Sequence, residues 1–179
     1  MTGLMAGKRG LIMGLANDRS IAWGIAKALA AQGAELAFSY QGEALQRRVA
    51  PLAQSLGSDF LFDCDVSDMA ALDRAFDELR RRWETIDFVV HAIGFSDKNE
   101  LRGKYVETSL DNFLMSMNIS VYSFTAVANR ARTMMPNGGS LLTLSYYGAE
   151  KVIPHYNVMG LAKSALETSV KYLAMDLGP

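Results

Sequence analysis

Apolar residues along this chain gather in five short runs, and the stretches between the runs carry apolar residues every three or four positions. The runs cover residues 9–14, 34–40, 59–66, 86–94 and 139–145. Each run is continuously apolar rather than alternating with polar residues, which is typical of strands buried on both faces of a parallel sheet. Strand and helix alternate five times, so the pattern predicts an α/β fold, a doubly wound parallel sheet with right-handed crossovers.

Helical periodicity is clearest between residues 68 and 83. The apolar residues of that stretch fall on one helical face, at Met69, Leu72, Phe76, Leu79 and Trp83. An earlier helix is marked by Ile21, Ile25, Ala28 and Leu29. A longer helix is expected to begin at a Thr108 cap and to end near Pro136.

Length and composition narrow the class of protein. A chain of 179 residues predicts a single domain, residues 1–179, that can bury a core. Eighteen Lys and Arg residues nearly balance 19 Asp and Glu residues, which argues against nucleic acid or anionic lipid as a partner. Cys64 is the only cysteine, so an internal disulfide is excluded and a small core residue is expected. Without a signal-peptide pattern or a long apolar run, the expected location is cytoplasmic.

The end of the chain predicts a domain that is incomplete at its C-terminus. The sequence stops just after the helix that carries Lys163. An open sheet would then end in an uncovered edge strand, and apolar side chains such as Leu166 and Leu173 would need a surface to pack on. We therefore expect the last strands of a Rossmann-like domain to be absent from this chain.

The turn after the first strand is a candidate nucleotide site. The segment GLANDRSIAWG lacks the G-x-G-x-x-G pattern, but it can do the same physical work. Gly14 permits a tight turn, Ser20 can cap the next helix, and free N–H groups around Ser20 and Ile21 can hold a pyrophosphate. Gly24 is expected to let the helix approach the sheet closely.

Residues at the ends of later strands extend this candidate site. Asp65 could accept a hydrogen bond from an adenine amino group, and Val66 could flank the ring. Ile93 and Gly94 follow the fourth strand and leave room for a ribose. Ligands bind at the carboxyl ends of strands in such sheets, so these residues support a dinucleotide site.

The choice between NAD and NADP stays open from the residues themselves. The second strand ends at Gln41, where an acidic residue would bond the ribose 2′-hydroxyl and repel a 2′-phosphate. Arg47 and Arg48 could meet a phosphate, but they lie well inside the next helix and are expected to face solvent. Because no residue is clearly placed to bind a 2′-phosphate, NAD is favoured over NADP.

Several segments together resemble a known family. GLANDRSIAWGIA, CDVSD, HAIGF and above all LLTLSYYGAEKVIPHYNVMGLAKSALE resemble the NADH-dependent enoyl-[acyl-carrier-protein] reductases of bacterial fatty-acid synthesis, a divergent branch of the short-chain dehydrogenase/reductase superfamily. The resemblance implies reduction of a trans-2-enoyl thioester on acyl carrier protein, with NADH as the cofactor and usually a homotetramer as the assembly. It also implies that the family's last strands and substrate-binding loop have no counterpart here.

The resemblance assigns roles to individual residues. Tyr146 and Tyr156 would be the active-site tyrosines, Lys163 would bind the nicotinamide ribose, and Ser96 would lie near the substrate. The residues that it places on NAD are Gly14, Ser20, Ile21, Gln41, Asp65, Val66 and Ile93. Met159 is expected to line an acyl channel, and no metal site is expected, since His91 and His155 lack metal-ligand spacing.

Tyr156 and Lys163 are seven residues apart, whereas the ordinary dehydrogenase pair is four apart. Both spacings return to nearly the same helical face, but seven residues reach about 10.5 Å along the axis rather than about 6 Å. This longer reach suits an acceptor whose developing oxyanion is displaced from the carbon that receives hydride. Tyr156 would donate a hydrogen bond to that oxygen, and Lys163 is expected to lower the phenol pKa.

Two alternatives stay open at this point. Tyr147 and Lys151 have the ordinary spacing of four and would support a dehydrogenase that acts on a ketone or alcohol, although Gly148 and Pro154 argue against a helix there. A protein that binds NAD without catalysis is the other alternative. Asn118 could be the helix asparagine of the wider superfamily or a residue with a local structural role.

Overall fold

The computed structural model describes residues 3–178, which form two compact units. The first unit comprises the chain up to Ala92 together with Asn129–Thr143, and the second comprises Ile93–Ala128 and the chain from Leu144 onward. The single domain expected from length stays a prediction. The elements of each unit are described separately below.

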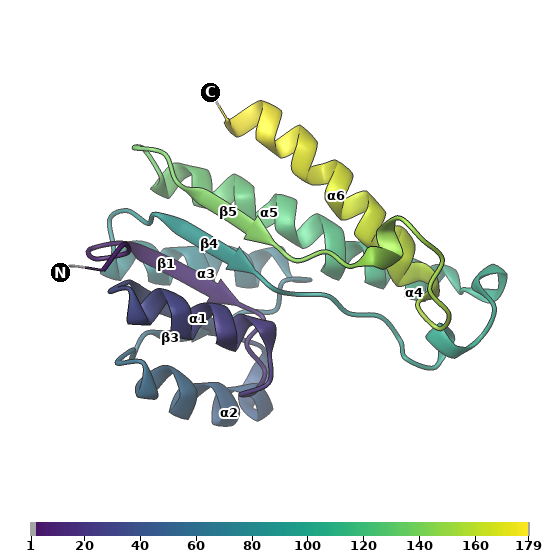
Figure 1. The fold of residues 1–179 in the computed structure, drawn as a ribbon, viewed down its shortest axis with the longest axis horizontal. Coiled ribbons are helices and arrows are strands. Elements are labelled where there is room, and N and C mark those ends of the chain that lie inside the picture. The colour runs from purple at the N-terminus through teal and green to yellow at the C-terminus, as the bar shows by residue number, and fades with distance from the viewer. Residues whose placement is uncertain (1–2, 179) are drawn as a thin grey trace. The chain divides into compact units, whose positions relative to one another are not determined.

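A five-stranded parallel sheet forms the centre of the first unit (Figure 1). Its order is β3-β2-β1-β4-β5, so the chain reverses direction across the sheet after β3, as a doubly wound fold requires. The prediction of fold class is confirmed. The strands are β1 (Arg9–Met13), β2 (Glu35–Tyr40), β3 (Leu61–Asp63), β4 (Phe88–His91) and β5 (Ser140–Thr143).

Strand register brings the candidate nucleotide residues of this unit to one edge of the sheet. Met13 at the end of β1 pairs with Ser39 of β2 and with His91 of β4. Tyr40, the last residue of β2, pairs with Asp63, the last residue of β3. The carboxyl ends of these strands are therefore level, and the turns that follow them begin side by side.

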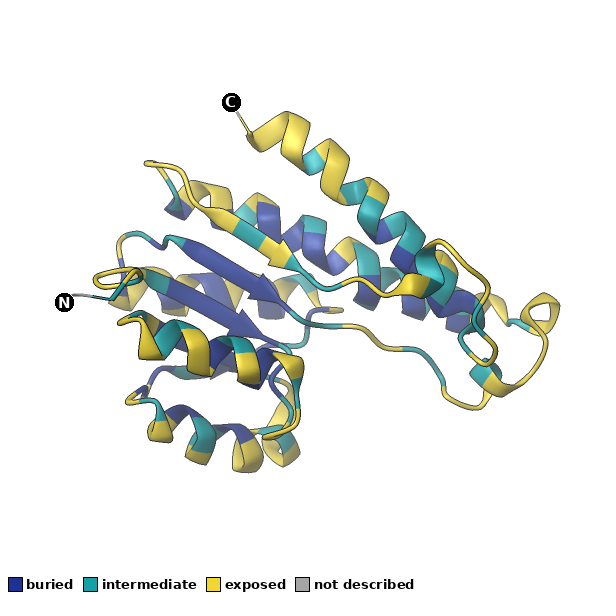
Figure 2. Ribbon diagram, viewed as in Figure 1, coloured by how far each residue is buried: buried dark blue, intermediate teal, exposed yellow. Residues whose placement is uncertain are grey.

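Helices cover both faces of the sheet. They are α1 (Ile21–Ala31), α2 (Gly42–Ser55) and α3 (Met69–Arg82), with α1 and α2 on one face and α3 on the other (Figure 1). Trp23 of α1 and Val49 of α2 pack with Ile12, Phe38 and Val90 of the strands in one buried cluster. Figure 2 shows β1 and β4 as the most deeply buried strands, while the edge strand β5 is partly exposed.

Two sequence expectations about α1 need correction. Gly24 does not bring the helix close to the sheet, because it is exposed and a β-carbon at this position would meet no atom within 4 Å. Ile21 is 67% exposed, and the buried face of α1 is formed by Ala22, Trp23 and Ala26. The helix itself is confirmed.

The second unit is helical. The long helix expected after Thr108 is present but interrupted: a π-helical turn, Asn118–Tyr122, separates α4 (Leu110–Met117) from α5 (Ser123–Ala131). Thr108 is not its cap, because its hydroxyl donates to the carbonyl of Tyr105. Ser109 caps α4 instead by accepting from the N–H of Asn112. The other elements of this unit are η1 (Glu100–Arg102), η2 (Tyr105–Glu107), η5 (Tyr147–Ala149) and α6 (Asn157–Leu177), whereas η4 (Arg132–Met134) belongs to the first unit.

Within residues 3–178, no helix combines the length and the apolar character needed to cross a lipid bilayer.

Gly14 and Gly24 should respond in opposite ways to the same added methyl group. Gly14 has φ +91°, and a β-carbon there would collide with the carbonyl of Ala92. Gly14→Ala is expected to lower the free energy of unfolding by at least about 2 kcal/mol. Gly24→Ala is expected to raise it by roughly 0.5–1 kcal/mol, because it replaces an exposed glycine within a helix. Urea unfolding measures both; equal effects would contradict the strain at Gly14.

Candidate functional site

The turn between β1 and α1 is shaped by its own side chains. The Ser20 hydroxyl accepts from the N–H groups of Ala16, at 3.1 Å, and Asn17, at 3.0 Å. Ser20 occupies the N-cap position of α1, but its side chain makes no hydrogen bond to the helix. The expected side-chain cap is therefore wrong. The positive end of α1 is left to attract an anion, as a pyrophosphate site requires.

Gln41 and Asp65 lie together at the ends of β2 and β3. The Gln41 amide nitrogen donates to Asp65 at 2.8 Å, and both the hydroxyl and the N–H of Ser67 donate to the other carboxylate oxygen. Burial raises the pKa of Asp65, but the Ser67 and Gln41 hydrogen bonds more than offset it and hold the pKa below its usual value. Asp65 is thus a charged acceptor at neutral pH, and neighbouring Val66 is buried.

Three other residues of the first unit that were considered from the sequence have ordinary structural roles. Arg47 is exposed and pairs with Glu43 within α2 at 3.1 Å, in line with the expected solvent-facing position. Cys64 is buried, and burial, followed by the charge of Asp63, raises the pKa of its thiol to about 12. The side chain of His91 is fully buried in β4 and lies 3.3 Å from the Thr143 hydroxyl. Across the described residues, no group of three or more potential ligands could hold a metal ion.

Lys163 of α6 is a buried cation in the second unit. It is 8% exposed, and its ammonium donates to the carbonyl of Leu144 at 2.7 Å. Burial lowers the pKa of Lys163. Gly94 lies against it, since a β-carbon at position 94 would be 3.6 Å from Nζ. A cation held this way has two further N–H groups for a ligand.

Tyr146 and Tyr156 form an aromatic pair in the same unit. Their ring centroids are 4.9 Å apart, with the rings inclined at 70°. Burial, and then the neighbouring Tyr146, raises the pKa of Tyr156. The expected lowering of this pKa by Lys163 is wrong, because the pKa shifts upward, with burial as the largest cause. The Tyr156 phenol is consequently a proton donor throughout the neutral range.

Tyr156 is not on a regular helical turn. It is the N-cap of α6, and the first helical residue, Asn157, has a left-handed φ of +37°. His155 on the other side has φ +63°. The seven-residue spacing therefore includes an irregular step, so ideal-helix arithmetic does not give the distance between Tyr156 and Lys163.

Gly148 leaves space for the Tyr156 ring and Gly160 leaves space for Gly148, and neither role was found from the sequence. A β-carbon at Gly148 would lie 2.5 Å from Cδ1 of Tyr156, and one at Gly160 would lie 2.9 Å from the carbonyl oxygen of Gly148. Both positions are thus restricted to glycine by close packing. The only feature of the sequence that could have indicated this close packing is the presence of glycines on both sides of Tyr156.

The alternative pair, Tyr147 and Lys151, lies in an irregular segment. Tyr147 opens the short helix η5, and the N–H of Lys151 donates to the Tyr147 carbonyl at 3.1 Å. Both side chains are exposed. Neither residue is on α6, which agrees with the expectation that this spacing of four is a coincidence.

The segment after β4 is held in place by buried polar side chains that the sequence did not single out. Ser120, in the π-helical turn, accepts from the N–H of Phe95 at 3.0 Å. Asn112 accepts from the Ser96 hydroxyl at 3.2 Å and from the N–H of Asp97 at 2.9 Å. Met159, expected to line an acyl channel, is buried and contacts Ser120. Substrate roles for Ser96 and Met159 stay predictions.

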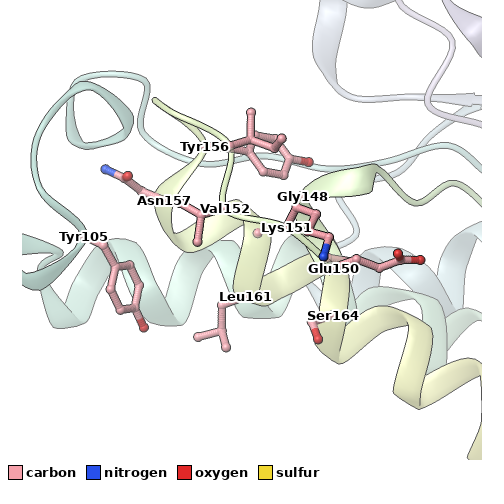
Figure 3. Close-up of a pocket in the computed structure, with 12 residues that line it drawn as sticks. Tyr105, Gly148, Glu150, Lys151, Val152, Tyr156, Asn157, Leu161 and Ser164 are labelled. Carbon is pink, nitrogen blue, oxygen red and sulfur yellow. The ribbon is translucent and has the colours of Figure 1, made fainter.

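A pocket of about 420 Å³ opens beside Tyr156 (Figure 3). Its walls are formed mainly by residues 148–153 and the first turns of α6, with Tyr105 on the opposite side. Of the predicted site residues, only Tyr156 lines it. In Figure 3 the Tyr105 and Leu161 side chains extend on one side, and Lys151 and Glu150 on the other.

The sheet order, the glycine turn and the acidic residue after β3 define an α/β protein of the dinucleotide-binding, Rossmann-like class. A sequence model of the family described as "Enoyl-(Acyl carrier protein) reductase" matches residues 14–179. The chain belongs to this family.

Individual relatives agree with this assignment. "Enoyl-[acyl-carrier-protein] reductase [NADH] 1" of Rhizobium meliloti is 66% identical over 177 residues, covering 99% of this chain and 65% of that protein. The FabI reductase of Rickettsia prowazekii is 52% identical, with coverages of 99% and 68%. The crystal structure of the Anaplasma phagocytophilum reductase in complex with NAD superposes with a TM-score of 0.97 at 62% identity, with coverages of 99% and 68%. The chain thus spans about two thirds of the length of these relatives.

Gly148→Ala is expected to displace the Tyr156 ring. The added methyl group would lie too close to the ring, and a shift of about 1 Å in a catalytic group can cost up to about a hundredfold in rate. In the enzyme proposed below, we expect kcat to fall by at least about tenfold, while NADH binding, measured by fluorescence titration, is unchanged. A Gly148→Ala variant with wild-type kcat would show that the ring tolerates the contact.

Proposed function

We propose that this chain provides the cofactor-binding and catalytic residues of an NADH-dependent enoyl-[acyl-carrier-protein] reductase. The reaction transfers hydride to the β-carbon of a trans-2-enoyl thioester and gives the saturated acyl chain. The observation that carries the proposal is the buried Lys163 with, seven residues before it, a phenol whose pKa is raised. Family membership supports it.

The proposed roles on the cofactor follow from the chemistry of each residue. The Gly14 turn and the start of α1, around Ser20 and Ile21, would hold the pyrophosphate. Asp65 would accept from the adenine amino group, with Gln41 and Val66 beside it. The other proposed cofactor residues are Ile93, Gly94 and Lys163. NADH would supply the hydride, and the chain's residues would bind and orient it.

Tyr156 is proposed as the donor to the developing enolate oxygen of the thioester. Its raised pKa keeps the phenol protonated at neutral pH, so it can donate when negative charge forms on that oxygen. Removing one such donor typically costs about 3 kcal/mol of transition-state stabilisation. Tyr146 packs on this ring and would help to place it, and Lys163 would hold the nicotinamide ribose.

The acyl carrier protein is the proposed carrier of the substrate, and a cytoplasmic homotetramer is the proposed form of the enzyme. Both rest on family membership. Sedimentation of the complete protein checks the assembly, and a stable monomer would contradict it.

Substitution of the two neighbouring tyrosines tests the proposed chemistry. Tyr156→Phe in the complete protein is expected to reduce NADH oxidation with crotonyl thioester by about a hundredfold, because one oxyanion donor is lost. Tyr147→Phe, a matched change at an exposed phenol, is expected to keep wild-type activity. Absorbance at 340 nm measures both. Activity that depends on Tyr147, or that appears with a ketone and not with the enoyl thioester, would favour the ordinary dehydrogenase.

A further inference from the structure

Asn157 makes contacts that no role in cofactor or substrate binding explains. It follows Tyr156 directly and is the first residue of α6. Its side-chain nitrogen donates to two backbone carbonyls, that of Glu100 at 3.0 Å and that of Gly103 at 2.9 Å. The primary amide has two N–H donors, so both are used. The start of α6 is thereby fastened to the segment around η1, more than fifty residues earlier in the chain.

The segment that accepts these two hydrogen bonds is itself stabilised by further hydrogen bonds. The Glu100 carboxylate accepts from the N–H of Ser109 at 2.9 Å and from its hydroxyl at 2.7 Å. It also accepts from the side chain of Asn112 at 3.2 Å. Asn112 is 4% exposed and binds Ser96 through its oxygen. Asn157 therefore binds the backbone of Glu100, whose carboxylate is linked through the buried Asn112 to Ser96.

The backbone on either side of Tyr156 needs such an anchor. His155 and Asn157 are the two non-glycine residues with positive φ among residues 3–178. Asparagine adopts this conformation more readily than most residues, but it still costs energy and persists only where surrounding contacts impose it. The Asn157 amide supplies two of those contacts one residue away from the phenol.

We propose that Asn157 is a positioning residue for Tyr156. Its amide donates to the carbonyls of Glu100 and Gly103, and this pair of hydrogen bonds, called the clasp below, fixes the turn that places the Tyr156 phenol. The clasp also ties the position of Tyr156 to the segment that begins at Ser96. Tyr156 and Ser96, two residues proposed to lie near the substrate, are then connected by one set of hydrogen bonds. The proposal rests on the proposed function, in which Tyr156 contacts the substrate.

Two substitutions separate the clasp from the backbone conformation. Asn157→Gly keeps the freedom to adopt a positive φ and removes the amide. Asn157→Asp keeps the size of the side chain but places a carboxylate that cannot donate against two carbonyl oxygens. Both are expected to lower kcat by at least about tenfold. The KM for NADH should stay within about twofold, because the change is confined to the catalytic step.

Ser169→Ala is the matched control. Ser169 of α6 and Thr125 of α5 share a hydrogen bond at 3.1 Å, so this variant also removes a polar contact between α6 and another part of the same unit. It lies three turns away from Tyr156 along α6, and wild-type kcat is expected. A loss of activity equal to that of Asn157→Gly would mean that any weakened contact of α6 is harmful, which would overturn the proposal.

A second readout does not depend on activity. Burial raises the pKa of Tyr156, so a ring released from its position should titrate closer to the ordinary value near 10. In protein labelled with ¹³C at the tyrosine ζ carbon, the Tyr156 pKa is expected to fall in Asn157→Gly and Asn157→Asp and to stay in place in Ser169→Ala. An unchanged Tyr156 pKa with wild-type kcat in Asn157→Gly would overturn the proposal.

The two proposals fail in different ways. If the unsubstituted protein does not oxidise NADH with crotonyl thioester, the proposed function fails, and the Tyr156 titration still decides whether Asn157 positions the ring. If the unsubstituted protein is active and both variants of Asn157 keep wild-type kcat and Tyr156 pKa, only the positioning proposal fails. Far-UV circular dichroism of each variant confirms that it is folded before either comparison is made.

Discussion

The parallel pairing of β1 on both of its edges is the constraint from which the first unit follows. β1 pairs with β2 on one side and with β4 on the other, and all three run in the same direction. Parallel neighbours cannot be joined by a tight turn, so each connection must cross the sheet through a helix. Because crossovers are right-handed, the reversal between β3 and β4 sends helices to opposite faces. The carboxyl ends of β1, β2, β3 and β4 are therefore at one edge of the sheet, where the turns that follow them begin side by side.

The second unit depends on polar side chains rather than on strand pairing. Its irregular segments are long, and backbone groups in such segments need partners. Asn112, Ser120 and Asn157 supply them by binding the main chain of residues 95–103. These side chains act as structural cross-links between segments distant in sequence. Tyr156 precedes the first residue of α6, and the ammonium of Lys163 in that helix donates to the irregular backbone at Leu144.

Much of the fold could be predicted from the sequence because buried parallel strands and amphipathic helices have strong periodic signals. The five strands and α3 came from those signals. The cap of α4 did not, because Thr108 and Ser109 are adjacent and both residue types can cap a helix. In the structure Ser109 is the cap, and its hydroxyl also donates to Glu100, nine residues earlier. The π-helical turn Asn118–Tyr122 was not predicted either, because the sequence analysis treated the stretch as one uninterrupted helix.

The sequence could nominate candidate site residues by their type and spacing, but it could not show properties that depend on distant neighbours. Tyr146, Tyr156 and Lys163 were identified through a long, specific segment. The direction of the Tyr156 pKa was wrong because it depends on burial, which spacing does not reveal. Gly148 and Asn157 were missed because their roles also depend on neighbours that spacing does not reveal. Gly148 packs against the Tyr156 ring, and Asn157 binds carbonyls more than fifty residues earlier in the chain.

The hydrogen bonds that the Ser20 hydroxyl accepts affect the thermodynamics of ligand binding at the turn between β1 and α1. Since that hydroxyl holds the N–H groups of Ala16 and Asn17, the loop between β1 and α1 acquires its shape when the protein folds. A ligand that meets an already ordered loop does not lose the conformational entropy of that loop on binding. Affinity at this end of the sheet is then governed by contacts and desolvation, and association needs no slow rearrangement of the turn.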